Sequence, residues 1–193
     1  LNAVIGFAQL AKQSQQTTEI SGYIDKIDQS SGTLLRLIND ILDIAKIESN
    51  KLVIEKRVFD FKRLLKRIEV MFESTADNKN LIWHLEDKLP SEQWYEGDEG
   101  RIEQILINIC GNAFKFTLAG KVSLSVSVRE NSGKQVQARI EVEDSGIGMS
   151  ASEQANIFDA FVQADASTSR KYGGTGLGLA ISKELAQLMG GDI

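Results

Sequence analysis

The sequence gathers asparagine, lysine, aspartate and glycine residues in three stretches whose spacing could support chemistry. In the first stretch, Asn108, Asn112 and Lys115 recur at intervals of four and three, so a helix would carry them on one stripe. Asparagine is a poor helix former, and two of them in an apolar helix require a reason. The amide oxygens could bind a metal ion and the ammonium could bind phosphate. Local capping near Gly111 is the alternative.

The second stretch, from Asp144 to Gly148, directly follows an alternating, strand-like segment. A carboxylate at the end of a strand can accept a hydrogen bond from a planar amine. Gly146 and Gly148 have no Cβ, so the backbone there could pass close to a ring. The pattern favours a pocket for a planar ligand, with an ordinary strand-to-helix turn as the alternative.

The third stretch places Gly174, Gly176 and Gly178 directly before a helical pattern. The start of a helix has free N–H groups and a positive dipole end, which suit a phosphate ligand. The polar segment before it reads as a mobile loop, whose Arg170 and Lys171 could meet phosphates. A flexible loop that caps a helix is the alternative. A P-loop would end in Gly-Lys-Ser/Thr, and a dinucleotide-binding turn would follow a strand, so neither motif fits.

Two other residues with reactive side chains are expected to be structural. His84, the single histidine, lies on the alternate face of a short strand-like segment, outside any recognisable catalytic motif. Cys110, the single cysteine, lies in an apolar helical run and reads as a small core residue. One cysteine excludes a disulfide within the chain, which fits a reducing compartment.

Length and composition describe a globular protein of 193 residues, 42% hydrophobic and 25% charged. This length allows one large domain, or a compact domain with an appendage. The net charge of −5 argues against non-specific nucleic-acid binding as the main role. No apolar run reaches membrane-spanning length.

Residues 1–56 have a helical pattern, with a short helix followed by a long seam of residues spaced four and three apart. The seam residues are Ile20, Ile24, Ile27, Ser31, Leu34, Ile38, Ile41, Ala45, Glu48 and Leu52. This spacing is typical of helix bundles, and further apolar residues widen the face beyond a two-helix seam. We therefore expect two chains to pair in a four-helix bundle, with packing of this hairpin on the following domain as the alternative.

After Arg57 the sequence changes to a mixture of helices and strands. Asp60 and Asp98 are the expected N-caps of two amphipathic helices. A further short helix is predicted over residues 153–162. Period-two alternation predicts three strands, over residues 81–86, 121–130 and 136–142.

Taken in order, the motifs resemble the N, G1, F and G2 boxes of sensor histidine kinases. The four boxes are Asn108-x3-Asn112-x2-Lys115, Asp144-x-Gly146-x-Gly148, Phe158-x2-Phe161 and Gly174-x-Gly176-x-Gly178. The residues around them are similar to the hybrid branch of that family, whose members also carry receiver domains. The resemblance covers essentially the whole chain.

This resemblance implies an α+β two-layer sandwich of the GHKL (Bergerat) type, in which helices cover one face of a mixed sheet. An antiparallel helical hairpin that forms a dimeric four-helix bundle is expected before it. The implied domains are a dimerisation and histidine-phosphotransfer hairpin over residues 1–56 and a catalytic ATP-binding domain over residues 57–193. Both are expected to be truncated, the first at its N-terminus and the second at its C-terminus.

The resemblance also assigns ligands. It implies that Asn112 holds Mg²⁺ on the phosphates of ATP, that Asn108 supports this cluster and that Lys115 contacts phosphate. Asp144 would bind the adenine amino group. The remaining implied ATP-binding residues are Gly146, Ile147, Gly148, Phe158, Arg170, Lys171, Gly174, Thr175, Gly176, Leu177 and Gly178.

The implied function is that of an ATP-dependent protein-histidine kinase in a two-component system. It would transfer the γ-phosphoryl group to a histidine on the helical bundle, for relay to an aspartate of a receiver domain. Related ATPases use a glutamate at the position of Asn108 to activate water, and an amide cannot act as a general base. A GHKL-type ATPase and a non-catalytic, nucleotide-sensing dimer module are the alternatives.

The phosphoacceptor histidine is expected just before Leu1, so no residue of this chain is assigned that role. The expected partners are a second copy of the chain and a receiver domain, with no nucleic acid. Membrane attachment is expected only through segments outside this chain. The chain would then be the cytoplasmic part of a protein anchored in the inner membrane of a bacterium.

Overall fold

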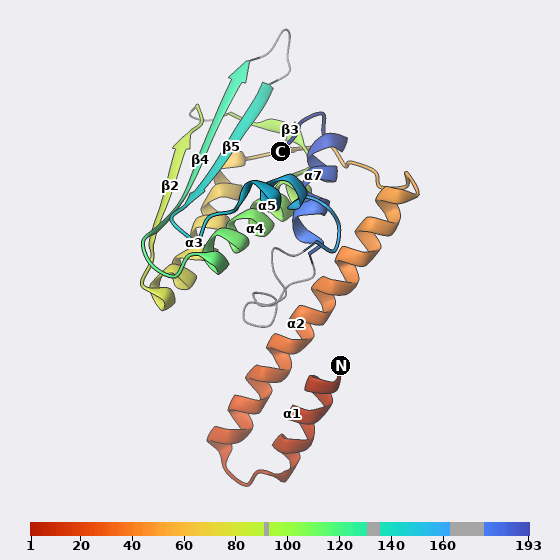
Figure 1. The fold of residues 1–193 in the computed structure, drawn as a ribbon, viewed down its shortest axis with the longest axis vertical. Helices are drawn as coiled ribbons and strands as arrows, with labels where there is room; N and C mark the ends of the chain where they lie inside the picture. Colours follow the sequence, from red (N-terminus) through yellow and green to blue (C-terminus); the bar gives the residue numbers. More distant parts are fainter. Residues whose placement is uncertain (91–92, 131–135, 163–175) are drawn as a thin grey trace. The chain divides into compact units, whose positions relative to one another are not determined.

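The computed structural model describes residues 1–90, 93–130, 136–162 and 176–193. The chain forms two compact units, Leu1–Leu52 and Val53–Ile193, coloured from red to orange and from yellow to blue in Figure 1. The predicted domain boundary, between residues 56 and 57, lies a few residues beyond the point where the contacts separate. No helix in these described ranges is long and apolar enough to cross a membrane.

The first unit is a helical hairpin of α1 (Asn2–Gln13) and α2 (Thr17–Glu48). The rings of Phe7 and Tyr23 stack across it with their centroids 6.4 Å apart. Figure 1 shows the two helices running side by side in opposite directions, as predicted.

The prediction of a helical pattern up to residue 56 was wrong at its end. Helix α2 stops at Glu48, where the Ser49 hydroxyl donates a hydrogen bond of 2.7 Å to the Ala45 carbonyl. Asn50 then takes a left-handed conformation with φ of 52°, which ends the helix. Leu52, the last residue of the predicted seam, therefore lies outside the helix.

Helix α2 exposes a row of large apolar side chains. The exposed residues are Ile24, Leu35, Ile38, Ile41 and Leu42, with 47% to 60% of their surface accessible. Single apolar residues on a surface are common, but several along one helix form an apolar patch that another element is expected to cover. Ile24, Ile38 and Ile41 belong to the heptad seam, and Leu35 and Leu42 widen the same apolar face. Pairing of this face with a second chain stays a prediction.

The second unit has two layers, a sheet and the helices that cover one of its faces (Figure 1). The sheet has the order β2-β4-β5, with β2 (Ile82–Lys88) parallel to β4 (Lys121–Glu130) and β4 antiparallel to β5 (Val136–Asp144). Helices α3 (Phe61–Lys79) and α4 (Glu99–Phe116) pack on the sheet. Helix α7 (Gly178–Leu188) packs against α4. The predicted mixed sheet under helices is confirmed.

The core forms between the helices and the inner face of the sheet. Val122, Leu124 and Val126 of β4 are fully buried, and the serines between them face the other side. The rings of Phe72 on α3 and Phe114 on α4 stack over this face, 5.1 Å apart and nearly parallel. The period-two pattern read from the sequence therefore determines which face of β4 meets the helices.

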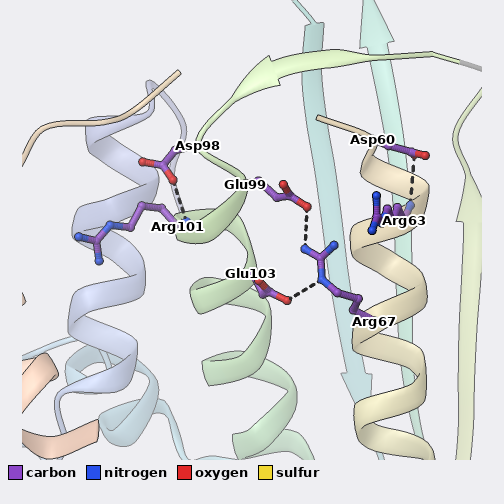
Figure 2. A network of polar contacts seen from close by, with 7 residues as sticks. All are labelled: Asp60, Arg63, Arg67, Asp98, Glu99, Arg101 and Glu103. Carbon is purple, nitrogen blue, oxygen red and sulfur yellow. Dashed lines mark hydrogen bonds and ion pairs between the residues drawn. The ribbon is translucent and has the colours of Figure 1, made fainter. Parts of the chain in front are cut away.

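Aspartates begin both covering helices, as predicted. The Asp60 carboxylate accepts a hydrogen bond from the Arg63 backbone N–H, and Asp98 accepts one from the Arg101 N–H. Figure 2 shows both caps and the ion pairs between the two helices, in which Arg67 of α3 donates to Glu99 and Glu103 of α4. These hydrogen bonds, first to Glu103 and then to Glu99, raise the pKa of Arg67. The pairs are partly exposed, so they align the helices more than they stabilise the fold.

Two short strands are not predicted by the sequence pattern. Strands β1 (Arg57–Phe59) and β3 (Tyr95–Gly97) pair antiparallel as a separate ribbon, with Arg57 opposite Gly97. A strand of three residues is too short to show alternation. The ribbon is held by contacts that the sequence does not reveal, including the Phe59 and Tyr95 rings, 6.5 Å apart.

The helix predicted over residues 153–162 also required correction. Helix α5 (Ala151–Asn156) starts earlier, at a capping box in which Ser150 and Glu153 bond each other's backbone N–H groups. It ends at Asn156, and turns follow in which Phe161 has a φ of 64°. Their aromatic residues gave the appearance of one helical face.

His84 and Cys110 are placed as expected. His84 lies exposed on the outer face of β2, between the half-buried Trp83 and Leu85. Cys110 is fully buried, and burial raises the pKa of its thiol to about 12. A thiol held neutral in this way is unreactive, so Cys110 is not a candidate for chemistry.

Candidate nucleotide-binding site

Helix α4 carries Asn108, Asn112 and Lys115 on one face, one turn apart. Asn112 is half-buried, and its side chain makes no hydrogen bond within the described ranges of the chain. The ammonium of Lys115 lies 4.7 Å from the centre of the Phe116 ring. Burial lowers the pKa of Lys115, because the charged form loses water contacts. A polyphosphate beside this face would compensate Lys115 for that loss.

Asp144 is the last residue of β5, and its carboxylate is brought to the C-terminal end of α4. Its Oδ1 accepts a hydrogen bond of 2.8 Å from the Gly146 N–H and lies 3.5 Å from the hydroxyl of Thr117. Its Oδ2 makes no hydrogen bond to any residue that the structure describes. The carboxylate is thus oriented by one oxygen and has the other available to an amine.

The two glycines after Asp144 are needed for different reasons. A Cβ on Gly146 would lie 2.6 Å from the Phe116 carbonyl oxygen and 2.7 Å from Asp144 Oδ1, so only glycine fits. Gly148 faces open space but has a φ of 68°, a left-handed conformation that disfavours side chains. Ile147 between them is 66% exposed. The close approach of Gly146 to the end of α4 brings the Asp144 carboxylate beside that helix.

Three residues that support this corner were not found from the sequence. Thr117 is fully buried and donates a hydrogen bond of 2.8 Å to the Ala113 carbonyl. The Ser145 hydroxyl accepts a hydrogen bond of 2.8 Å from the Lys121 N–H, which fastens the turn to the start of β4. A Cβ on Gly120 would run into that hydroxyl, and Gly120 also has a φ of 105°. The only signal in the sequence was the position of Thr117 immediately after the α4 pattern.

Asn108 faces the start of α7. Its Nδ2 donates hydrogen bonds to the Gly178 carbonyl at 3.1 Å and to the Ser182 hydroxyl at 3.3 Å. Two candidate residues far apart in the sequence, Asn108 and Gly178, are therefore in direct contact. Ser182, which completes this contact, was not found from the sequence.

Further candidate residues lie around the start of α7. The Phe161 N–H donates a hydrogen bond of 3.1 Å to the Gly176 carbonyl, so the residues on either side of 163–175 are joined. Leu177 is buried, and Phe158 is half-buried with the Lys183 ammonium 5.4 Å from its ring centre. The remaining candidates lie outside the described residues: Arg170, Lys171, Gly174 and Thr175.

Substitution by alanine should affect stability differently at the two described glycines of this region. Gly176 has a φ of 71°, and a Cβ there would lie 2.9 Å from the Val162 carbonyl oxygen. Gly176→Ala should therefore lower the free energy of unfolding by about 1–3 kcal/mol. At Gly178 a Cβ would make an ordinary contact, 3.4 Å from Asn108 Cγ, so Gly178→Ala should be neutral or slightly stabilising. Urea unfolding of both variants measures this, and a larger loss for Gly178→Ala would contradict it.

The donor set fits Mg²⁺ bound together with a nucleotide. The described residues contain no cluster of three histidine, cysteine, aspartate or glutamate side chains that could hold a metal by themselves. Mg²⁺ prefers oxygen ligands and commonly takes one or two from the protein and the rest from phosphates and water. The amide oxygen of Asn112 is such a ligand, and the free Oδ2 of Asp144 suits the amino group of an adenine.

Comparison with known proteins identifies the class to which this fold and site belong. Residues 97–193 match the family of histidine kinase-, DNA gyrase B- and HSP90-like ATPases. Residues 1–50 match the His Kinase A (phospho-acceptor) domain. The chain belongs to the sensor histidine kinases, and it contains the helical hairpin and the ATPase-type domain that form their core.

Individual relatives agree with this assignment. The signal transduction histidine-protein kinase BarA of Escherichia coli K12 is 39% identical over 193 residues, which are all of this chain and 21% of BarA. The hybrid signal transduction protein dokA of Dictyostelium discoideum is 41% identical over 197 residues, covering 12% of dokA. The crystal structure of full-length ShkA in complex with AMPPNP superimposes with a TM-score of 0.72 at 34% identity, over 98% of this chain and 38% of ShkA. The chain thus spans about a fifth of the length of BarA and 12% of the length of dokA.

Proposed function

We propose that this chain is the core of an ATP-dependent protein-histidine kinase of a two-component system. It binds Mg²⁺-ATP and transfers the γ-phosphoryl group to a histidine on the helical bundle. The observation that carries the proposal is the Asp144 carboxylate, which the Gly146 N–H orients at the end of α4 while its Oδ2 stays available. The match of residues 1–50 to a phospho-acceptor domain supports a histidine as acceptor.

Each side chain then has a distinct task. Asp144 accepts a hydrogen bond from the adenine amino group, and Gly146 keeps the backbone close enough for the base to reach it. Asn112 supplies an amide oxygen to Mg²⁺, and Lys115 neutralises phosphate charge. When bound, Mg²⁺ balances the charge of the phosphate oxygens during transfer. Phosphoryl transfer requires mainly positioning and charge neutralisation, and the face of α4 provides both.

The residue at position 108 favours transfer of the phosphoryl group to a protein side chain over transfer to water. Asn108 stands where the related hydrolytic ATPases have a glutamate, and an amide cannot take a proton from water. Its Nδ2 is, in addition, fully engaged with α7. The transferred group should therefore go to a histidine that is itself a good nucleophile.

Partners and location extend the same proposal. The exposed apolar row on α2 fits a second copy of the chain, which would complete a four-helix bundle. The aspartate that receives the phosphoryl group next would belong to a receiver domain, on the same longer protein or on a separate one. The two units would lie on the cytoplasmic side of a bacterial inner membrane, anchored by segments outside this chain.

Transfer from radiolabelled ATP tests the function directly. A form of the protein that begins upstream of Leu1 and includes the histidine expected there should acquire an acid-labile, alkali-stable label. Phosphohistidine has this stability, and the label should vanish when that histidine is changed to glutamine. Release of inorganic phosphate without labelled protein would instead indicate a GHKL-type ATPase. Binding of ATP without either product would indicate a nucleotide-sensing module.

A further inference from the structure

A small hydrogen-bond network holds the side chain of Asn108 against the first turn of α7. Asn108 Nδ2 donates to the Gly178 carbonyl at 3.1 Å and to the Ser182 hydroxyl at 3.3 Å. The Ser182 hydroxyl donates to the same carbonyl at 2.8 Å. Ser182 is fully buried, so its hydroxyl cannot exchange these partners for water.

This network determines which end of the Asn108 amide faces α7. The Gly178 carbonyl can only accept, so the Asn108 atom next to it must be the nitrogen. The Ser182 hydroxyl gives its proton to that carbonyl and accepts the second Nδ2 hydrogen. Both hydrogens of Nδ2 are then used, and Asn108 can offer only an acceptor, Oδ1, to anything else.

The oxygen of the Asn108 amide is not used by this network. Asn108 Oδ1 makes no hydrogen bond within the part of the chain that the structure describes. Asn112 lies one turn further along the same face, and its amide is also without a hydrogen bond among these residues. Two amide oxygens are thus available next to each other, where a phosphate-bound cation would need oxygen ligands.

We propose that Ser182 is a positioning residue that makes Asn108 present its oxygen to the Mg²⁺ of the bound nucleotide or to a water on that Mg²⁺. The inference rests on the proposed function and adds a role for a residue outside the four motifs. It excludes hydrogen-bond donation from Asn108 to phosphate, because the only donor on that side chain is committed to α7. Ser182 acts here without touching the nucleotide.

A purely structural role for Ser182 would be to join α4 and α7, and the Mg²⁺ dependence of binding separates the two roles. The experiment measures the affinity for AMPPNP by calorimetry, with Mg²⁺ and with EDTA, and the melting temperature of each variant. The variants are Ser182→Ala, Asn108→Ala and the double substitution. If Ser182→Ala does not fold, Ser182→Cys leaves no cavity, with a slightly larger side chain, and replaces the strong acceptor with a weak one.

Mg²⁺ should raise the affinity for AMPPNP in the original protein, and in Ser182→Ala this increase should be about tenfold smaller. Loss of a residue that orients a metal ligand commonly has an effect of this size. The affinity of Ser182→Ala in EDTA should stay within about twofold of the original protein. In the Asn108→Ala background, Ser182→Ala should cause no further loss, because Ser182 acts through Asn108.

Equal losses with Mg²⁺ and with EDTA, an unchanged Mg²⁺ effect, or additive losses in the double variant would each overturn this inference. None of these results would affect the proposed function. A failure of the unsubstituted chain to bind AMPPNP would instead overturn the proposed function, so the two failures are distinguishable.

Discussion

Asp144→Asn should weaken ATP binding by about 100-fold or more. This factor corresponds to about 3 kcal/mol, from the loss of one hydrogen bond and from the placement of two donors against each other. The carboxylate must accept on both sides, since Oδ1 takes the Gly146 N–H at 2.8 Å and Oδ2 is left for the adenine amino group. An asparagine has one acceptor and one donor at these positions. Either orientation of its amide places an NH₂ group against an N–H donor.

Calorimetric titration of the 193-residue chain with ATP measures this effect. Glu143→Gln is the matched control, because it removes the same charge from the neighbouring residue of β5. Glu143 points to the other face of the sheet, where its oxygen lies 3.6 Å from the exposed Lys121 ammonium. Its substitution should change the affinity by less than about twofold. Unchanged affinity in Asp144→Asn would remove this carboxylate from the site.

Gly146→Ala should impair both the site and the fold. The new Cβ would lie 2.6 Å from the Phe116 carbonyl oxygen, a backbone atom at the end of α4 that cannot rotate away. Either that helix end or the turn must move, and the hydrogen bond from Gly146 to Asp144 moves with it. We expect affinity for ATP to fall by about 100-fold and the free energy of unfolding to fall by about 1–3 kcal/mol.

Gly148→Ala provides the comparison for this prediction. Its Cβ would meet no atom within 4 Å, so the only cost is the left-handed backbone at a φ of 68°. That cost is about 1 kcal/mol, and the Asp144 carboxylate keeps its place. Calorimetry and urea unfolding of both variants are the measurements. A Gly148→Ala protein that loses more affinity than Gly146→Ala would show that close approach to α4 is not what requires glycine.

Local signals in the sequence were sufficient for most of the elements. Asp60 and Asp98 were recognised as caps because their side chains bond N–H groups only three residues away. Strands β4 and β5 were recognised because alternate residues face opposite sides of a sheet, whatever lies beyond it. The candidate residues Asn108, Asn112 and Asp144 were found from spacing, and the family from the order of their motifs.

Elements whose signal is short or non-local were missed or misplaced. The ribbon of β1 and β3 depends on residues about 40 positions apart, and each strand has only three residues. The end of α2 was misplaced because the heptad pattern continues to Leu52 while Ser49 and Asn50 end the helix. A pattern of apolar residues reports which face is buried, and it does not report where the backbone hydrogen bonds stop.

The sequence by itself determined which residues could bind a nucleotide and which class of protein carries them. Only the tertiary structure decided how these residues are used. It brings Asp144 against the end of α4 through Gly146, and it turns the nitrogen of Asn108 toward Ser182 on α7. Both arrangements join segments that are distant in the sequence, and the packing of α4 against the sheet and α7 creates them. Spacing along one helix identifies a polar face, but the direction of each amide depends on the partner that the fold places beside it.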